Sequence, residues 1–392
     1  MATAARDVRA PSAFASSDTV LHDERMSSKP LELPIVEVSG SPRELGRGQG
    51  EAFRAKVNDF VAMRLDAVRA YFAERGQGGW ERLLEVGREG FSIYEQWDPE
   101  GFAEHCGLAE GAGIDAARLF TVANMTDLRD AVLLAAERGA PLKKNAVSEG
   151  CSSVLLPGGS TANGQPLVGQ TWDLNPPDVD YVIGVHRRPA EGPETWAVTC
   201  TGCLTLVGMN ADGLAVGTTN IKTYGSKPGV GYLSILHRAV RAKGVDEAIA
   251  LVKGAPHAGA HTYWLADATQ QVEWESSPNA SFLRDTRQGP IWRTNHCLSP
   301  LHRELEGEEP SESSRKRFET IGAQVGKGGL DVSGLKAVFA DRSQGILSVN
   351  RYPEDGQGTA TNAVFIASPS EKRAWACRGP ADRGAWVELR FG

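Results

Sequence analysis

The sequence predicts a layered α+β protein, and three observations support this. Helical periodicity dominates residues 41–145, strand patterns dominate after residue 150, and one helical stretch at about 231–253 interrupts the strands. A run of helices followed by a run of strands is typical of folds in which helical layers cover antiparallel sheets. The length of 392 residues allows one large domain or two of medium size.

The helical region begins with a recognisable start signal. Ser41-Pro42-Arg43-Glu44 fits a capping box with proline at the first helical position. Apolar residues then recur with a period of 3.6 until glycines at 76, 78 and 79 interrupt the pattern. Similar patterns predict helices over 80–97 and 115–137. The periodic apolar residues of the first long helix are Phe53, Val57, Phe60, Val61, Leu65, Val68 and Phe72.

The strand-rich region contains one well-defined hairpin signal. Leu204–Met209 and Leu214–Thr219 flank Asn210-Ala211-Asp212-Gly213, a segment of turn-forming residues. We expect further strands at 152–156, 166–173, 181–187, 196–201 and 262–275. The charged, Ser-rich segment 306–314 is expected to be a surface loop, and no internal repeat is present.

Composition excludes several classes of protein. A formal net charge of -7 gives no electrostatic reason to bind nucleic acid or an anionic membrane. The longest apolar run, Ala131–Ala136, is far shorter than the ~20 residues of a membrane-spanning helix. Six cysteines in so long a chain do not form a disulfide scaffold. We therefore expect a soluble, cytoplasmic protein with reduced thiols.

The first 33 residues are expected to be a flexible leader, because they are polar and poor in aromatic residues. They contain no apolar segment of the kind a secretory signal requires. Asp7, Asp18 and Asp23 argue against a transit peptide, and Met26 is an alternative start of translation.

Most common catalytic motifs are absent. There is no His-Glu-x-x-His, no Gly-x-Ser-x-Gly and no complete phosphate loop, and Gly46-Arg-Gly-Gln-Gly50 follows a helix start rather than a strand. Cys200-Thr-Gly-Cys203 has the spacing of a redox pair or of half a zinc site. No second cysteine pair completes a metal site, which favours ordinary strand and turn residues at this position.

The junction Glu149-Gly150-Cys151 lies where the helical sequence pattern ends and the strand pattern begins. Gly150 has no Cβ, so its carbonyl can be approached closely by the thiol of Cys151. Attack on that carbonyl would break the 150–151 bond and free an α-amine with a reference pKa near ~8. Such an amine can serve as general base for the thiol of its own residue. From the residues alone, a buried strand cysteine is the alternative interpretation.

Several segments, in order along the chain, resemble the acyl-coenzyme A:6-aminopenicillanic acid acyltransferase family. These are self-cleaving, peptidase C45-like N-terminal-nucleophile hydrolases, more distantly related to choloylglycine hydrolases. The resemblance runs from about residue 34 to near 390, and the Ser152-Ser153 pair departs from the usual Thr pair. The segments that carry it are Gly40–Gly46 with Gly50, Leu108–Asp115, Glu149–Ser153, Gly169–Asp173, Asn210–Val216 with Asn220, Ser276–Pro278, Thr294–Cys297 and Ser348–Arg351.

The resemblance implies a four-layer αββα sandwich and a cleavage site between Gly150 and Cys151. Residues 34–150 would form an α chain and residues 151–392 a β chain, both within one domain. The two chains would stay associated after cleavage. No metal or redox cofactor, nucleic acid or membrane partner is implied, and the substrate would be a small-molecule amide.

The resemblance also assigns roles. Cys151 would be the nucleophile, Asn295 an oxyanion donor and Asn220 a weaker second donor. Asp173 would hold the freed amine or polarise the thiol, and Arg351 would supply positive charge beside it. The alternatives are turn or loop asparagines, a capping Asp and a surface Arg. Gln170 and Ser277 are expected to give supporting hydrogen bonds, and Trp172 belongs to the core or to the substrate pocket.

Three functions remain open at this stage. The first is an amidohydrolase that cleaves a non-peptide amide, of the N-acyl amine or N-acyl amino acid type, through an acyl-thioester. The second is an N-acyltransferase of the penicillin acyltransferase type, in which an amine replaces water and acyl-CoA or an amide donates. The third is an unprocessed protein that binds small acylated ligands without turnover. Hydrolysis is favoured, because an acyl-CoA donor would need basic residues to bind its phosphates. The candidates near the matched segments are few: Arg187, Arg188, Lys222 and Lys227.

Overall fold

The computed structural model describes residues 29–74, 79–139 and 150–392. Most of the expected leader, and Glu149 of the expected cleavage signature, lie outside these residues. Residues Leu31–Gly392 form one compact unit.

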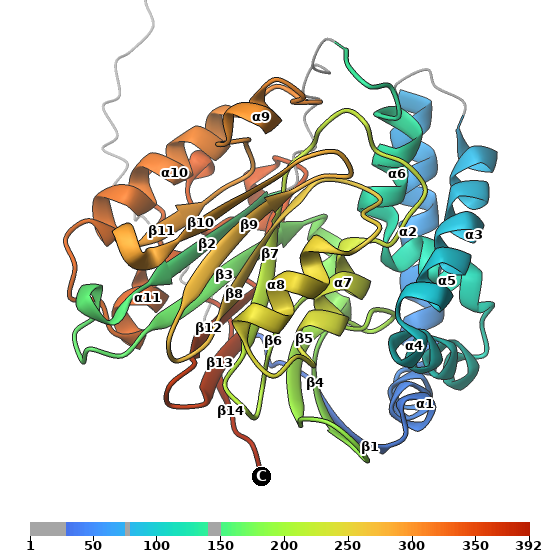
Figure 1. The fold of residues 1–392 in the computed structure, drawn as a ribbon, viewed down its shortest axis with the longest axis horizontal. Helices are drawn as coiled ribbons and strands as arrows, with labels where there is room; N and C mark the ends of the chain where they lie inside the picture. The colour runs from blue at the N-terminus through green and yellow to red at the C-terminus, as the bar shows by residue number, and fades with distance from the viewer. Residues whose placement is uncertain (1–28, 75–78, 140–149) are drawn as a thin grey trace, which may run out of the picture. The chain divides into compact units, whose positions relative to one another are not determined.

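The described residues before 134 form six helices (Figure 1), so the region is helical as predicted, although the sequence pattern did not single out the helix Pro99–Ala112. At the start of the first, the Glu44 carboxylate accepts hydrogen bonds from the backbone N–H of Ser41 at 2.8 Å and from its hydroxyl at 2.7 Å. Among the described residues no helix is long and apolar enough to cross a membrane. The helices are α1 (Pro42–Ala52), α2 (Arg54–Glu74), α3 (Trp80–Trp97), α4 (Pro99–Ala112), α5 (Ala116–Ala123) and α6 (Met125–Leu133).

Glycines allow α1 and α4 to pack very closely. A Cβ on Gly46 would lie 1.8 Å from the carbonyl oxygen of Glu104, and one on Gly50 would lie 2.2 Å from that of Leu108. The Gly46–Gly50 segment therefore serves helix packing. This agrees with the prediction that it is not a dinucleotide-binding fingerprint.

Two sheets form the centre of the fold. The larger has the order β1-β4-β5-β6-β7-β8-β9-β10, and the smaller has the order β11-β2-β3-β12-β13-β14. Neighbouring strands are antiparallel except β1 and β4. The larger sheet contains β1 (Ile35–Gly40), β4 (Val182–Pro189), β5 (Thr195–Cys200), β6 (Val207–Asn210), β7 (Ala215–Asn220), β8 (His261–Ala266), β9 (Gln271–Ser276) and β10 (Ser281–Asp285). The smaller contains β2 (Gly150–Leu156), β3 (Leu167–Leu174), β11 (Ile291–Arg293), β12 (Ala360–Ser368), β13 (Arg373–Arg378) and β14 (Val387–Leu389).

The sheets stack face to face between helical layers, which gives the predicted αββα sandwich (Figure 1). Strands β2 and β3 pack on β7, and the side-chain oxygen of Gln170 joins the two sheets. It accepts hydrogen bonds from the Thr218 backbone N–H and the Trp264 indole N–H, both at 2.7 Å. Helices α7 (Tyr232–Ala239) and α8 (Val245–Lys253) cover the larger sheet, and α10 (Glu312–Val325) and α11 (Val332–Phe339) cover the smaller one. A short α9 (Pro300–Arg303) precedes α10.

The predicted hairpin is present between β6 and β7. The side chain of Asn210 accepts the backbone N–H groups of Asp212 and Leu214, and Gly213 adopts φ +95°. The helical stretch expected at 231–253 is interrupted at residues 240–244, which separate α7 from α8.

The loop expected over 306–314 ends earlier than predicted. Helix α10 starts at Glu312, and the hydroxyl of its N-cap residue Ser311 accepts the Ser314 N–H at 3.0 Å. The face of α10 that is buried begins with polar residues, Ser313, Ser314 and Arg317, so apolar periodicity does not reveal it. The sequence therefore failed to predict this helix.

Candidate active site

Antiparallel pairing in the smaller sheet brings several of the predicted site residues together at one end of its strands. Strand β2 starts at Gly150, where its neighbours β3 and β11 end and β12 begins. Gly150 is paired with Asp173, and Cys151 is paired with Trp172. Residues that are distant in sequence therefore meet around the start of β2 because of strand direction alone.

Cys151 is connected to both predicted asparagines. It is 6% exposed, and its backbone N–H donates to the side-chain oxygen of Asn295 at 2.8 Å. The side-chain N–H₂ of Asn295 donates to the backbone carbonyl of Asn220, at the end of β7, at 2.9 Å. Asn295 therefore links the start of β2 in one sheet to the end of β7 in the other.

Asp173 and Arg351 form a buried ion pair beside Gly150. The guanidinium Nε of Arg351 lies 3.6 Å from Oδ2 of Asp173, and each side chain is 1% exposed. Arg351 also donates to the hydroxyls of Thr359, at 2.6 Å, and of Ser313. Burial raises the pKa of Asp173, an effect that Arg351 opposes, and burial lowers the pKa of Arg351. Arg351 is thus a buried site residue and not a surface one.

The place of residue 150 admits only glycine without adjustment. A Cβ there would lie 3.0 Å from Oδ2 of Asp173 and 3.0 Å from the guanidinium carbon of Arg351. Both neighbours are buried and held by other contacts, so neither can move freely. The absence of a side chain at Gly150 is what brings the ion pair against the backbone next to Cys151.

Sequence reasoning missed a third charged residue, Arg317. Its guanidinium donates to the carbonyl of Cys151 at 2.5 Å, to the hydroxyl of Ser152 at 2.8 Å and to the side-chain oxygen of Asn295 at 2.9 Å. The residue is on α10, which was not predicted. The spacing of Arg317, Ile321 and Val325 at every fourth position was the available signal for its buried face.

A small pocket with about 20 Å³ of free space lies beside Cys151. Trp172 lines it and also belongs to the buried hydrophobic core, so the structure is compatible with both roles expected for this residue. Tyr232 and His261, neither of which was predicted, form another wall, with their rings stacked at 4.4 Å. His261 Nε2 lies 2.7 Å from the Asp127 carboxylate, which fixes the ring. The residues lining the pocket are Thr126, Cys151, Trp172, Asp173, Leu174, Thr218, Asn220, Tyr232 and His261.

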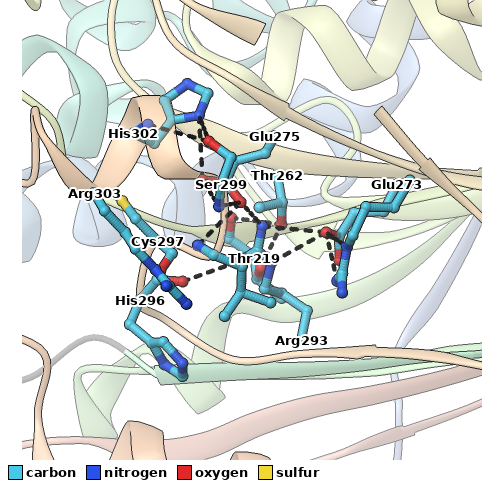
Figure 2. Close-up of polar contacts among 12 residues, drawn as sticks. Thr219, Thr262, Glu273, Glu275, Arg293, His296, Cys297, Ser299, His302 and Arg303 are labelled. Atoms are coloured by element: carbon cyan, nitrogen blue, oxygen red, sulfur yellow. Dashed lines mark hydrogen bonds and ion pairs between the residues drawn. The ribbon is translucent and has the colours of Figure 1, made fainter. Parts of the chain in front are cut away.

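A buried ionic network anchors the loop that carries Asn295 (Figure 2). Arg293 is fully buried, and its guanidinium pairs with Glu275 and, at 3.2 Å, with Glu273. Glu275 also accepts the backbone N–H groups of Leu298 and Ser299. Although burial opposes it, the pairing with His302 and Arg293 lowers the pKa of Glu275 to about 2. The network keeps both ends of the segment 293–299 on β9.

Ser299, His302 and Glu275 do not form a second catalytic triad. The Ser299 hydroxyl and a Glu275 oxygen both approach the same nitrogen of His302, Nδ1, at 2.7 and 3.2 Å. A triad needs the hydroxyl and the carboxylate on opposite ring nitrogens. The cluster therefore supports the Asn295 loop.

The remaining predicted residues occupy different places. Gln170 bridges the two sheets, as described above. Ser277 lies in the turn after β9, two strands from Asn220, where its hydroxyl accepts the Ala280 N–H at 3.1 Å. His296 bonds the Ser314 hydroxyl at 2.9 Å, and burial together with Arg293 and Arg317 lowers its pKa to about 4.

The Cys200–Cys203 segment has the surroundings of structural residues. Both side chains are buried, and the Cys203 N–H donates to the Cys200 carbonyl in a turn at 2.9 Å. Burial raises the pKa of Cys203 to about 12 and that of Cys200 well above its usual value. Across the described residues, no group of three or more His, Cys, Asp or Glu side chains is arranged to hold a metal ion.

Comparison with known proteins identifies the family. The family model of acyl-coenzyme A:6-aminopenicillanic acid acyl-transferase matches residues 160–382, more than half of the chain, and the chain belongs to this family. The matched region starts after Cys151. This makes the protein an enzyme of amide-bond chemistry, amidohydrolase or acyltransferase.

Individual relatives are more distant. The 40 kDa form of acyl-coenzyme A:6-aminopenicillanic-acid-acyltransferase from Emericella nidulans is 26% identical over 344 residues, covering 84% of this chain and 88% of that protein. Penicillin V acylase from Agrobacterium tumefaciens is 12% identical, with a TM-score of 0.35 over 61% of this chain and 86% of its own. A conjugated bile acid hydrolase variant from Clostridium perfringens is 12% identical, with a TM-score of 0.39 over 62% and 97%.

Proposed function

We propose that this enzyme is an N-terminal-cysteine amidohydrolase that activates itself by cleavage between Gly150 and Cys151. The observation that carries the proposal is the position of Cys151. Its backbone nitrogen contacts Asn295, its strand neighbour Gly150 touches the Asp173–Arg351 pair, and a pocket opens beside it. A thiol with a hydrogen-bonding amide, a buried ion pair and space for a ligand has the parts that acyl transfer to sulfur requires.

Self-cleavage would follow from the same geometry. The Cys151 thiol loses its proton, and its sulfur attacks the carbonyl carbon of Gly150. The carbon–nitrogen bond breaks, and the nitrogen of Cys151 takes up the proton and becomes a free amine. Water then hydrolyses the Gly150 thioester, releasing a carboxylate at Gly150 and restoring the thiol.

Turnover would repeat these steps on a substrate amide. The freed amine takes the thiol proton, the sulfur attacks the amide carbonyl, and the proton passes to the departing amine. Water hydrolyses the acyl-thioester and releases the acid. Asn295, whose side-chain N–H₂ also donates to the Asn220 carbonyl, and Asn220 would donate to the developing oxyanion, and Asp173 would hold the amine while Arg351 balances its charge.

The two chains produced by cleavage are proposed to stay together, because buried ion pairs cross between residues 34–150 and 151–392. Arg187 lies 2.5 Å from Glu104, with side chains that are each 3% exposed. Asp127 lies 2.7 Å from His261, likewise buried. Separation would expose this buried interface to water and break both contacts, which is unfavourable.

Water is proposed as the main acyl acceptor. Three of the four basic residues that sequence analysis considered as ligands of CoA phosphates already contact carboxylates. Arg187 is buried against Glu104, Arg188 contacts Glu37 at 2.7 Å, and Lys222 contacts Glu308 at 2.5 Å. The site around Cys151 thus gives little support for a phosphate-binding group.

Acyl transfer is the second candidate, supported by the Emericella nidulans relative, which is named an acyltransferase. The two functions share the Cys151 thioester and differ in what reaches its carbonyl. The test supplies an activated acyl donor with rising concentrations of amines and measures free acid against new amide. New amide dominating at millimolar amine would replace hydrolysis with transfer.

Intact mass spectrometry of the purified protein, before and after incubation with a panel of acyl amides, tests the whole proposal. We expect two fragments and a transient acyl adduct on Cys151. A chain that stays whole, and that binds acyl amides without any adduct or product, would instead be a ligand-binding protein.

A further inference from the structure

We propose that Arg317 is a positioning residue that orients the amino group of Cys151 and the amide of Asn295 and adds positive charge to the site. This inference rests on the proposed function, because it concerns the amine that self-cleavage would release. Sequence analysis assigned no role to this residue.

The guanidinium holds two parts of the site at once. One nitrogen, Nη1, donates to the Cys151 carbonyl and the Ser152 hydroxyl, and the other, Nη2, donates to Oδ1 of Asn295. Its Nε lies 3.3 Å from the hydroxyl of Ser313 on the same helix. The side chain is fully buried, so these contacts are not exchanged for water. Arg317 thereby fixes the distance between β2 and the Asn295 loop.

The same contacts fix which way the Asn295 amide faces. Its Oδ1 receives both Arg317 and the Cys151 N–H, so its nitrogen must face the Asn220 carbonyl. If the Asn295 amide were rotated by 180°, its N–H₂ group would face two other donors, the Cys151 N–H and the Arg317 guanidinium. After cleavage the amine of Cys151 can still donate to Oδ1, and its lone pair remains for the thiol proton.

Arg317 also changes the balance of charge around the thiol. Among the described residues, Asp173 is the carboxylate that acts on both Arg317 and Arg351, while Asp355, which also acts on Arg351, is paired with Arg342. Burial and Arg351 lower the pKa of Arg317 to about 9, which leaves it cationic at neutral pH. The surplus positive charge favours a thiolate and an uncharged amine.

The other titratable groups nearby do not cancel this charge. On the Asn295 loop, Arg293 is paired with Glu275, and the lowered pKa of His296 leaves its ring neutral. On the pocket side, His261 is paired with Asp127. Arg317 is therefore the residue whose removal should most alter the protonation of Cys151.

The test compares the full-length variants Arg317→Lys and Arg317→Gln with Arg187→Gln. Arg187 is a matched control, because it is also buried and donates to a carboxylate, to the Gln49 amide and to the Leu204 carbonyl. Three quantities are measured: self-cleavage by intact mass, the melting temperature, and the pH at which iodoacetamide half-modifies Cys151, quantified on its own peptide.

We expect Arg317→Gln to move the alkylation midpoint of Cys151 upward by about one pH unit or more, because a cation no longer favours the thiolate. Arg317→Lys should leave the alkylation midpoint close to the wild-type value, since lysine retains the positive charge. It should slow self-cleavage, because lysine cannot contact β2 and Asn295 at the same time through two nitrogens. Arg187→Gln should lower the melting temperature and leave the midpoint unchanged. An Arg317→Gln chain that stays uncleaved while equally stable Arg187→Gln is cleaved also supports the proposal.

An Arg317→Gln protein that is cleaved at the wild-type rate with the wild-type midpoint would overturn the inference. So would a lower melting temperature as its only change, because that describes a purely structural arginine. Failure of the proposed function is distinguishable, since the wild-type chain itself would then remain intact between Gly150 and Cys151.

Discussion

Cys151 and the Cys200–Cys203 pair are both buried thiol sites on strands of this fold, yet their surroundings differ in charge. Cys151 is at the start of β2, in contact with Arg317 through its carbonyl and with Asn295 through its N–H. Cys200 and Cys203 lie at the end of β5, near the closed Arg64–Asp178 pair, whose atoms are 3.1 Å apart.

If Cys151 is the nucleophile, as proposed, burial alone does not decide whether a cysteine reacts. In the turn after β5 the nearby cation, Arg64, is paired with its own carboxylate, Asp178, and burial raises the pKa of both thiols. At the start of β2, Arg317 and Arg351 both lie near the Asp173 carboxylate, and a pocket gives a ligand access to Cys151. A reactive cysteine therefore needs unbalanced positive charge and space beside it. Each prediction below tests one part of this contrast.

The largest effect is expected from removing the thiols themselves. Cys151→Ala should abolish self-cleavage and lower turnover by on the order of 10⁴-fold or more, as loss of a nucleophile does. Cys200→Ala should leave both intact and cost about 1 kcal/mol of stability. Intact mass and product formation measure the outcome, and equal loss of activity in folded Cys200→Ala would move the chemistry to the β5 turn.

The next effect concerns the amide that contacts Cys151. Asn295→Ala should slow acylation by roughly 10²–10³-fold, the usual cost of losing one oxyanion donor. Rapid-quench mass spectrometry of the acyl adduct measures the rate. Asn210→Ala is the control, because the buried Asn210 amide makes only structural contacts with backbone groups, namely the Val240 and Ala242 carbonyls and the N–H groups of Asp212 and Leu214 in its own hairpin. Equal rates in both variants would remove Asn295 from the chemistry.

A smaller effect is expected at the scissile residue. Gly150→Ala should slow self-cleavage about tenfold, because the added methyl meets the Asp173 and Arg351 side chains at 3.0 Å and overpacking costs about 1–3 kcal/mol. Gly159→Ala should have no effect, since nothing lies within 4 Å of that position. The time course of fragment formation distinguishes them, and identical time courses would show that the ion pair yields readily.

The smallest effect tests the positive charge near Cys151 through His296. Burial, with help from Arg293 and Arg317, lowers the pKa of His296 to about 4 from 6.5. The unfolded chain therefore binds a proton that the folded chain does not, so His296 contributes stability above pH 6.5 that is lost as the pH falls through about 4. His296→Gln should reduce proton uptake on unfolding at pH 5 by about one. Urea unfolding across pH 4–7 measures this, and an unchanged slope would argue against the lowered pKa.

Sequence reasoning found the residues that lie in short local motifs and missed those placed by tertiary packing. Cys151, Asp173 and Asn295 stand at strand ends with recognisable neighbours, and antiparallel pairing brings them together. Arg317 is on a helix whose buried face begins with polar residues, so only Ile321 and Val325, four and eight positions later, marked that face. His261 joins the pocket only because Asp127, far away in the sequence, holds its ring.

The layers of the fold were predictable for a related reason. Helical and strand periods differ sharply on either side of residue 150, and each period reports which face is buried. The start of α10 at its Ser311 cap was missed because the charged, Ser-rich composition of residues 306–314 was interpreted as a surface loop.

The central claim is that Cys151 becomes the N-terminal nucleophile of the mature enzyme. Intact mass spectrometry of freshly purified wild-type protein, followed by brief treatment with an activated acyl donor, tests it most directly. The account predicts a fragment that runs from Cys151 to Gly392 and carries the acyl group on its first residue. A chain unbroken at Gly150–Cys151 that still turns over an acyl amide would contradict it.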